Sequence, residues 1–199
     1  MKENFRTYST EIFEALMRTK NFILISFALF VFGIIIGFVI YHLSPGNEFF
    51  SLILKELENI GVEFGEKNTI EMIVFIFLHN LQAVAMSIIS GIILIFPVIF
   101  MLVNGMTIGF FLGAAGNPLI LIAIIPHGIF EIPALVISAA MGMRLGFVIM
   151  MPEKGKTRFE CAKEVSRDIG KILILIIPLL LIAAVIEVTI SARLADMML

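Results

Sequence analysis

Long apolar segments alternate with short polar connectors along the chain, and this pattern predicts helices that cross a membrane. Four blocks contain few or no charged residues, at positions 21–41, 72–115, 118–151 and 172–190. A helix that spans ~30 Å of hydrocarbon needs about 20 residues at about 1.5 Å per residue. The second block is long enough for two spans, with Ser90-Gly91 and Pro97 as the turn and the restart. We therefore predict one membrane domain over residues 1–199 with five spans, at about 21–41, 71–91, 94–115, 132–151 and 171–191.

The third block is longer than one span requires and contains internal prolines. Inside a helix, Pro126 and Pro133 would each leave the carbonyl four residues earlier without its donor. We therefore expect a short apolar element near 118–125, a bend at 126–128 and a full span from about Pro133, a residue type that suits the first position of a helix. The predicted fold class is an all-α integral membrane protein with a broken or re-entrant element before the fourth span.

Three connecting segments show apolar residues at helical spacing, which predicts amphipathic helices on the surface. Our preferred interpretation is that they lie on the bilayer or against the bundle, and the alternative is that they bind a partner. The residues are Phe5, Tyr8, Ile12, Phe13 and Leu16 in the first segment, Phe49, Phe50, Ile53, Leu57 and Ile60 in the second, and Phe159, Ala162, Val165 and Ile169 in the third.

Composition supports a lipid environment. Apolar residues make up 60% of the chain and charged residues 15%, whereas a soluble domain has about 25% charged residues. The formal net charge is -2 and no basic patch is interleaved with aromatic residues, so we expect no nucleic-acid partner. The single Cys161 excludes an internal disulfide.

Charge in the connectors predicts the orientation of the chain in the plasma membrane. The N-terminal segment and the loop at 152–171 are rich in Lys and Arg, while the segment at 42–69 carries five glutamates and two lysines. Basic segments stay on the cytoplasmic side. Five spans then place the N-terminus inside and the C-terminus outside.

Small residues recur at every fourth position in three predicted spans. They are Gly33 and Gly37, then Gly105, Gly109 and Gly113, then Gly142 and Gly146, the last pair extended backwards by Ala134 and Ser138. Such stripes allow two helix backbones to approach closely in lipid. We favour packing within the chain over a homodimer interface.

Glu131 is the most informative polar residue, because it is the only charged residue between Glu71 and Arg144. A carboxylate at mid-bilayer costs about 2.5–3.5 kcal/mol, so it should face protein or water and have a partner. His127 precedes it by four residues and would share its helix face. If a helix starts near Pro133, the positive end of that helix would also favour the anion.

Other polar residues occur at a similar predicted depth and could converge on Glu131. They are His79, Asn80 and Gln82 in the second span, Asn104 in the third and Glu187 in the last. A hydrogen-bonded structural group is our first interpretation, and a proton or ion path is the second. A metal site is the third, although two ligands alone are a weak zinc signal. The sequence has no Ser-His, GxSxG or P-loop pattern, so we expect no catalytic residue, metal or cofactor.

The segment PHGIFEIPALVISAAMGMRLG at 126–146 resembles the signature of the stage II sporulation protein M family, which comprises membrane proteins of bacteria and archaea. The similar positions are His127, Gly128, Glu131, Pro133, Ala134, Arg144, Leu145 and Gly146. A second family feature is similar to His79-Asn80 and to Asn104-Gly105 with Gly109, although many members have two asparagines where this chain has His79-Asn80. The resemblance covers about residues 75–146.

The resemblance implies a five-span protein without established enzymatic activity. The member from sporulating bacteria is a scaffold for cell-wall-degrading partners during engulfment, but this chain has neither a long external domain nor a wall-binding module. We therefore expect a non-catalytic membrane scaffold that contacts lipids, other membrane proteins or a second copy of itself. The alternatives are a transporter or channel in which His127 and Glu131 line a path and, third, an intramembrane metallohydrolase.

Overall fold

The protein is an all-helical bundle in the computed structural model, which describes residues 2–44, 48, 51–52, 55, 68–114 and 118–198, with side chains except at 2–7, 118–127 and 190–198. The predicted surface helix at 49–60 lies mostly outside the described residues. The described elements are α1 (Lys2–Leu43), α3 (Thr69–Ile89), the short 3-10 helix η1 (Ser90–Ile92), α4 (Ile95–Ala114), α5 (Pro118–Met150) and α6 (Arg158–Met198).

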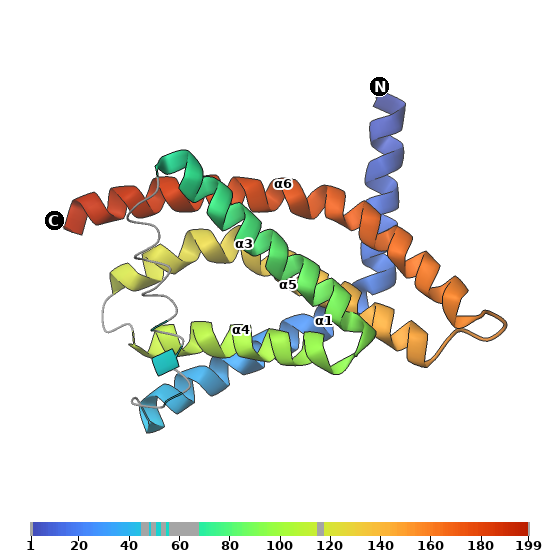
Figure 1. Cartoon of the computed structure of the whole chain (residues 1–199), viewed down its shortest axis with the longest axis horizontal. Helices are drawn as coiled ribbons and strands as arrows, with labels where there is room; N and C mark the ends of the chain where they lie inside the picture. The colour runs from blue at the N-terminus through green and yellow to red at the C-terminus, as the bar shows by residue number, and fades with distance from the viewer. Residues whose placement is uncertain are drawn as a thin grey trace.

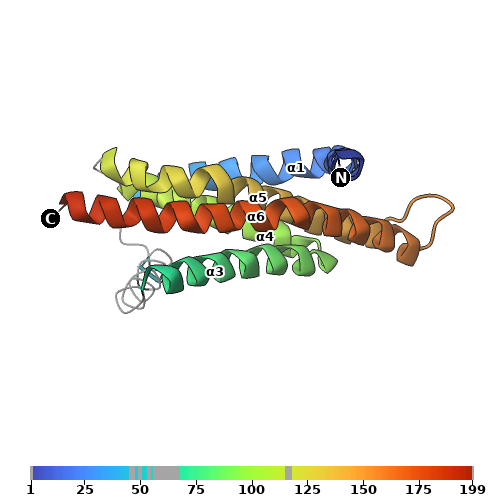
Figure 2. The same cartoon turned by 90° about the horizontal axis from the view of Figure 1, so that it is seen from above.

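Five of the described helical segments are long and apolar enough to cross a membrane, which confirms the predicted fold class. They run roughly alongside one another, with the two ends of the chain at opposite ends of the bundle (Figures 1 and 2). Large apolar side chains such as Leu24, Phe27 and Ile35 are exposed on the outside. An apolar exterior of this kind suits contact with lipid, because lipid tails cannot satisfy polar groups.

The predicted break in the third apolar block is wrong, because α5 is one continuous helix from Pro118 to Met150. Pro118 occupies the first helical position, as expected of proline. Pro126 and Pro133 lie inside the helix, where each removes one backbone donor. Membrane helices tolerate such losses because neighbouring groups and small local adjustments satisfy the freed carbonyls. Glu131 consequently lies within a helix and not beside a helix N-terminus.

Two of the predicted surface helices are continuous with spans. The first part of α1, drawn in dark blue, stands across one end of the bundle, and the rest runs along it (Figures 1 and 2). The predicted stripe at the start of α6 is partly wrong: Phe159 is exposed, whereas Cys161, Val165 and Asp168 are buried. The buried face of α6 continues into the last span, where Ile172 and Ile176 are buried. Packing of that span against the bundle therefore determines which face of the start of α6 is buried.

Glycines allow α1 and α4 to pack backbone against backbone. A Cβ added at Gly33 would lie 3.1 Å from the Cα of Gly105 and would overlap the carbonyl oxygen of Leu102. One turn further along, a Cβ at Gly37 or at Gly109 would overlap backbone of the facing helix. Close backbone approach of this kind supplies the van der Waals contact that holds membrane helices together. At the end of this contact, a Cβ at Gly113 would press on the ring of Tyr41.

A second glycine contact joins α5 to η1 and the end of α3. A Cβ at Gly142 would overlap the carbonyl oxygen of Ser87, and one at Gly146 would overlap that of Gly91. Helix α5 also packs against α1, α4 and α6, so it is the central helix of the bundle. Its buried side chains include small ones, with Ala134, Ala139 and Ala140 fully buried, and larger ones such as Met141. The central position of α5 places its polar residues between helices.

Candidate functional site: two polar centres on the central helix

The first polar centre joins α3 to α5 within the membrane part of the bundle. Glu131 on α5 is only 2% exposed, and its Oε1 accepts a hydrogen bond from Nδ2 of Asn80 on α3. Ile76, one turn before Asn80, packs against Ala184 and Val188 of α6. A buried carboxylate is tolerable only when it is hydrogen-bonded, and here the neighbouring helix supplies a donor.

Only some of the predicted polar residues meet at this centre. His79 is exposed and its ring stacks on Phe75 of the same helix, with ring centroids 6.3 Å apart. Asn104 donates to the carbonyl oxygen of Phe100 on its own helix at 2.7 Å. The sequence could not single out Asn80, because successive helix positions differ in direction by about 100° and a single sequence does not show which helix lies opposite each of them.

The remaining predicted residues lie on α5 and α6. Gly128 is half-buried and a Cβ there would touch Ile132, while Pro133 is exposed. Glu187 is half-buried on α6, beside Val188 of the α3 contact. The side chain of His127 lies outside the described residues, so the proposed His127–Glu131 pair stays a prediction. Within the described residues no three His, Cys, Asp or Glu side chains gather as a metal site would require.

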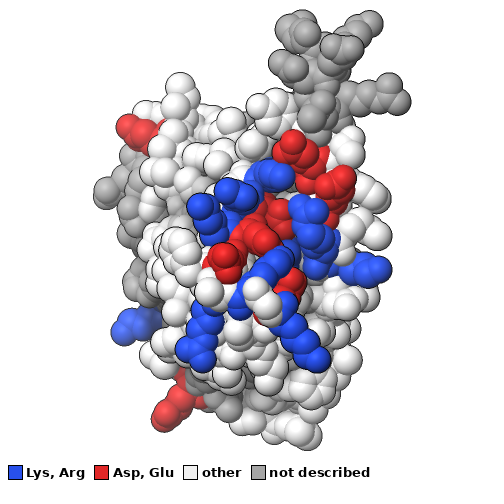
Figure 3. Space-filling model, turned by 90° about the vertical axis from the view of Figure 1, so that its right-hand side faces the viewer, with Lys and Arg blue, Asp and Glu red and all other residues white. Residues whose placement is uncertain are grey.

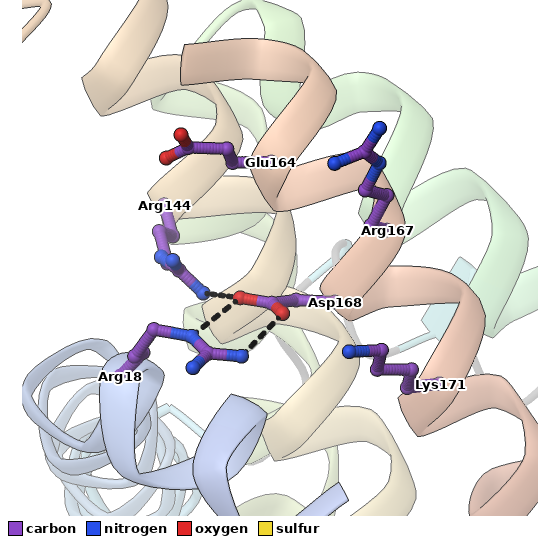
Figure 4. A pocket seen from close by; sticks show the side chains of 6 residues that line it. All are labelled: Arg18, Arg144, Glu164, Arg167, Asp168 and Lys171. Atoms are coloured by element: carbon purple, nitrogen blue, oxygen red, sulfur yellow. Dashed lines mark hydrogen bonds and ion pairs between the residues drawn. The ribbon is translucent and has the colours of Figure 1, made fainter. Parts of the chain in front are cut away.

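The second polar centre is an ion-pair network nearer the C-terminal end of α5. Arg144 donates from Nη1 to Oδ2 of Asp168 at 2.8 Å and to Oγ1 of Thr19 at 3.0 Å. Arg18 donates to the same carboxylate with two nitrogens, Nε to Oδ2 at 3.1 Å and Nη2 to Oδ1 at 2.7 Å. Figure 4 shows the two guanidinium groups reaching Asp168 from α5 and α1. Two-pronged arginine–carboxylate pairs of this kind are strong and directional.

Burial makes this network a structural tie among three helices. The Asp168 side chain is 6% exposed and that of Arg144 12%, whereas Arg18 is 45% exposed. Thr19 is fully buried and donates to the carbonyl of Ala15 at 2.9 Å, so its oxygen remains able to accept from Arg144. The two centres lie thirteen residues apart on α5, which is about 20 Å along a helix.

The sequence reasoning missed Asp168, and a signal for it exists. Cys161, Val165, Ile172 and Ile176 are buried at four- and seven-residue spacing along α6, which is the pattern of a helix face turned inward. Asp168 occupies the position of that face between Val165 and Ile172. Asp168 is a single acid within an apolar helix face, and Arg144 is a single arginine within another span. Together they predict a buried ion pair.

A cavity of about 270 Å³ adjoins this network, lined by Arg18, Arg144, Glu164, Arg167, Asp168 and Lys171. Lys171 also pairs with Glu11 at 3.1 Å, and Glu164 pairs with Lys156 at 2.9 Å. Hydrogen bonds from Lys156 to Glu164 and Glu153 raise the pKa of that lysine above its usual range. Charged side chains gather on this end of the molecule (Figure 3).

Comparison with known proteins adds the family. The model of the family described as Stage II sporulation protein M matches residues 26–192, a stretch that includes Asn80, Glu131, Arg144 and Asp168. An uncharacterized protein of Methanocaldococcus jannaschii is 29% identical over 196 residues, covering 94% of this chain and 89% of the relative. Another from the same organism is 32% identical over 189 residues, covering 89% and 97%. No solved structure matches.

Proposed function

This chain belongs to the stage II sporulation protein M family, and from that premise we propose that it is a non-catalytic scaffold which holds other membrane proteins in place. The observation that supports the proposal is that its buried carboxylates bind side chains of neighbouring helices. Glu131 is engaged by Asn80, and Asp168 by Arg18 and Arg144, in each case across helices. Ties between helices stiffen a bundle, and a stiff body is what a scaffold requires.

The outer faces of the bundle offer the surfaces for partners. The first part of α1 crosses the end of the bundle and exposes Tyr8 and Phe13. We propose that this arm lies in the membrane interface, where amphipathic helices are stable, and that partner proteins or a second copy of the chain pack on the adjoining spans. No nucleic-acid partner is expected from this surface.

A flux assay separates the scaffold from the alternative, a transporter or channel that uses Glu131. Glu131→Gln keeps the size of the side chain but cannot carry a negative charge. If the protein is a scaffold, the pure wild type in proteoliposomes should conduct neither protons nor common ions, and Glu131→Gln should show the same lack of flux. A proton or substrate flux that Glu131→Gln abolishes would overturn the scaffold proposal in favour of transport, because intramembrane carboxylates often form such paths.

The stability of the same centre provides a positive result for the scaffold. Asn80→Leu removes the Nδ2 donor to buried Glu131, and the loss of a buried hydrogen bond costs about 1–3 kcal/mol. We expect lower thermal stability and weaker recovery of the membrane proteins that copurify with the wild type in fixed proportion. His79→Leu is the matched control, because His79 directly precedes Asn80 and its side chain is exposed. This variant should leave the thermal stability and the recovery of copurifying proteins unchanged.

We also propose that the N-terminus is cytoplasmic and the C-terminus external. Arg18 pairs with Asp168, and Lys171 pairs with Glu11, so the basic start of α1 and the 152–171 segment meet at one end of the bundle. The positive-inside rule requires such basic residues to lie at one membrane face. Cys161 is buried and is a poor probe, so we suggest single cysteines in a Cys161→Ala background. Lys154→Cys, exposed after α5, should react with an impermeant maleimide only from inside, and Ser44→Cys, exposed after α1, only from outside. The reverse pattern would invert the topology.

A further inference from the structure

The cavity beside the ion-pair network has more positive than negative charge in its wall. Four cations, Arg18, Arg144, Arg167 and Lys171, face two carboxylates, Glu164 and Asp168. Both carboxylates are already engaged, Asp168 by the two arginines and Glu164 by Lys156. Among the described residues, none pairs with Arg167. The other cations of the wall have partners, because Arg18 also pairs with Glu14, and Lys171 pairs with Glu11, both outside the wall. Arg167 therefore supplies the free donors of the cavity, and the paired cations can reach an anion through their remaining N–H groups.

The position of the cavity identifies the kind of anion. Lys171 is the last charged residue before an apolar run that continues to Glu187, and Arg18 lies just before the apolar run of α1. These residues therefore stand where the hydrocarbon of the bilayer meets water, at the level of the lipid headgroups. Glu164, Arg167, Asp168 and Lys171 recur at three- and four-residue spacing and so line one face of α6. Figure 4 shows the charged ends of Arg167 and Lys171 on the same side of α6 as Asp168.

We propose that this cavity binds the headgroup phosphate of an anionic phospholipid from the leaflet that surrounds this end of the bundle. Arg18 and Arg144 are held in place by Asp168, and Arg167 and Lys171 complete the site with donors at its opening. Guanidinium groups match phosphate oxygens in shape and charge, and basic pockets between membrane helices are known to hold lipid headgroups. The lipid would bridge α1, α5 and α6 at the point where their side chains already meet.

Binding of a fluorescent phosphatidylglycerol to the full-length protein in phosphatidylcholine nanodiscs tests the proposal. Arg167→Gln should weaken binding about fivefold, and addition of Lys171→Gln should weaken it about fivefold more, as expected for the loss of one interfacial cation each. Arg167 is exposed, so circular dichroism should show an intact fold. Lys163→Gln removes the same charge from an exposed position of α6 outside the cavity wall and should have no effect.

Three outcomes would overturn the proposal. One is unchanged binding in the Arg167→Gln and Lys171→Gln double variant. Another is equal weakening by Lys163→Gln, which would indicate general surface charge and not a site. The third is complete displacement of the labelled lipid by millimolar inorganic phosphate, which would identify a soluble phosphate as the occupant. Retention of phosphatidylglycerol through purification by the wild type, and its loss from the double variant, would support the lipid as the source.

Discussion

Replacement of Asp168 by Asn should destabilise the protein by about 3–5 kcal/mol, the usual cost of removing one partner from a buried ion pair. The carboxylate is the common partner of Arg18 and Arg144. Arg18 is nearly half exposed and can turn toward water, but the Arg144 side chain is only 12% exposed. Its charge would remain buried, with Thr19 as its remaining hydrogen-bond partner in the network. The chain contains no Trp, so thermal unfolding is best followed by far-ultraviolet circular dichroism.

Two controls separate the buried charge from the loss of an acid as such. Glu164→Gln removes an acid that lies in the same cavity wall but is half exposed, and it should cost no more than about 1 kcal/mol. The double variant Asp168→Leu and Arg144→Leu removes both buried charges and should recover most of the lost stability. If Asp168→Asn melted like the wild type, the network would not be the buried tie that its geometry indicates.

Replacement of Gly109 by Ala should also destabilise the bundle, by about 1–3 kcal/mol or more, because it overpacks a tight contact. The added methyl group would overlap the carbonyl oxygen of Ile34 and lie 2.9 Å from its Cα. These are backbone atoms, so a change of side-chain rotamer cannot relieve the clash and α1 must move away from α4. Gly109→Leu should be worse still, with loss of folded protein from the membrane fraction.

The matched control is Gly170→Ala on α6, where a Cβ would have no neighbour within 4 Å. Replacement of Gly by Ala at an open helix position should stabilise the protein by about 0.5–1 kcal/mol. Detergent-solubilised variants compared by thermal melting provide the measurement. Equal melting temperatures for Gly109→Ala and the wild type would mean that the two helices are further apart than described.

The five spans were predictable because lipid imposes one requirement, about 20 apolar residues per crossing, that a single sequence displays directly. The break before Pro133 was wrongly predicted because proline was weighed by its effect on an isolated helix. Within a bundle, α5 is held by contacts along its whole length, and those contacts are not visible in the sequence. The same limitation explains why Asn80 could not be chosen over His79 as the partner of Glu131: the direction of a side chain depends on which helix lies opposite.

The importance of Glu131 was predictable from its isolation among apolar residues, whereas that of Asp168 was obscured by its setting. Asp168 lies in a stretch with many charges, including Arg167 and Lys171 on either side. Composition there suggests a solvated helix, and only the register of buried Val165 and Ile172 reveals the inward position. The helical periodicity of the buried residues in that segment therefore indicates the inward position of Asp168.

The pairing of the helices has a consequence for how the protein is made. Helix α1 packs mainly on α4, and α3 mainly on α5 and α6. In the described part of the chain, the first two spans to leave the ribosome therefore do not pack on each other as a hairpin. While α5 is still being synthesised, Asn80 of α3 has no carboxylate to receive its hydrogen bond, and the glycine face at Gly91 has no helix against it. The early spans therefore remain without their packing partners, in the bilayer or bound to an insertion chaperone, until α5 is made. Chains truncated before α5 should consequently be preferred substrates of membrane proteases.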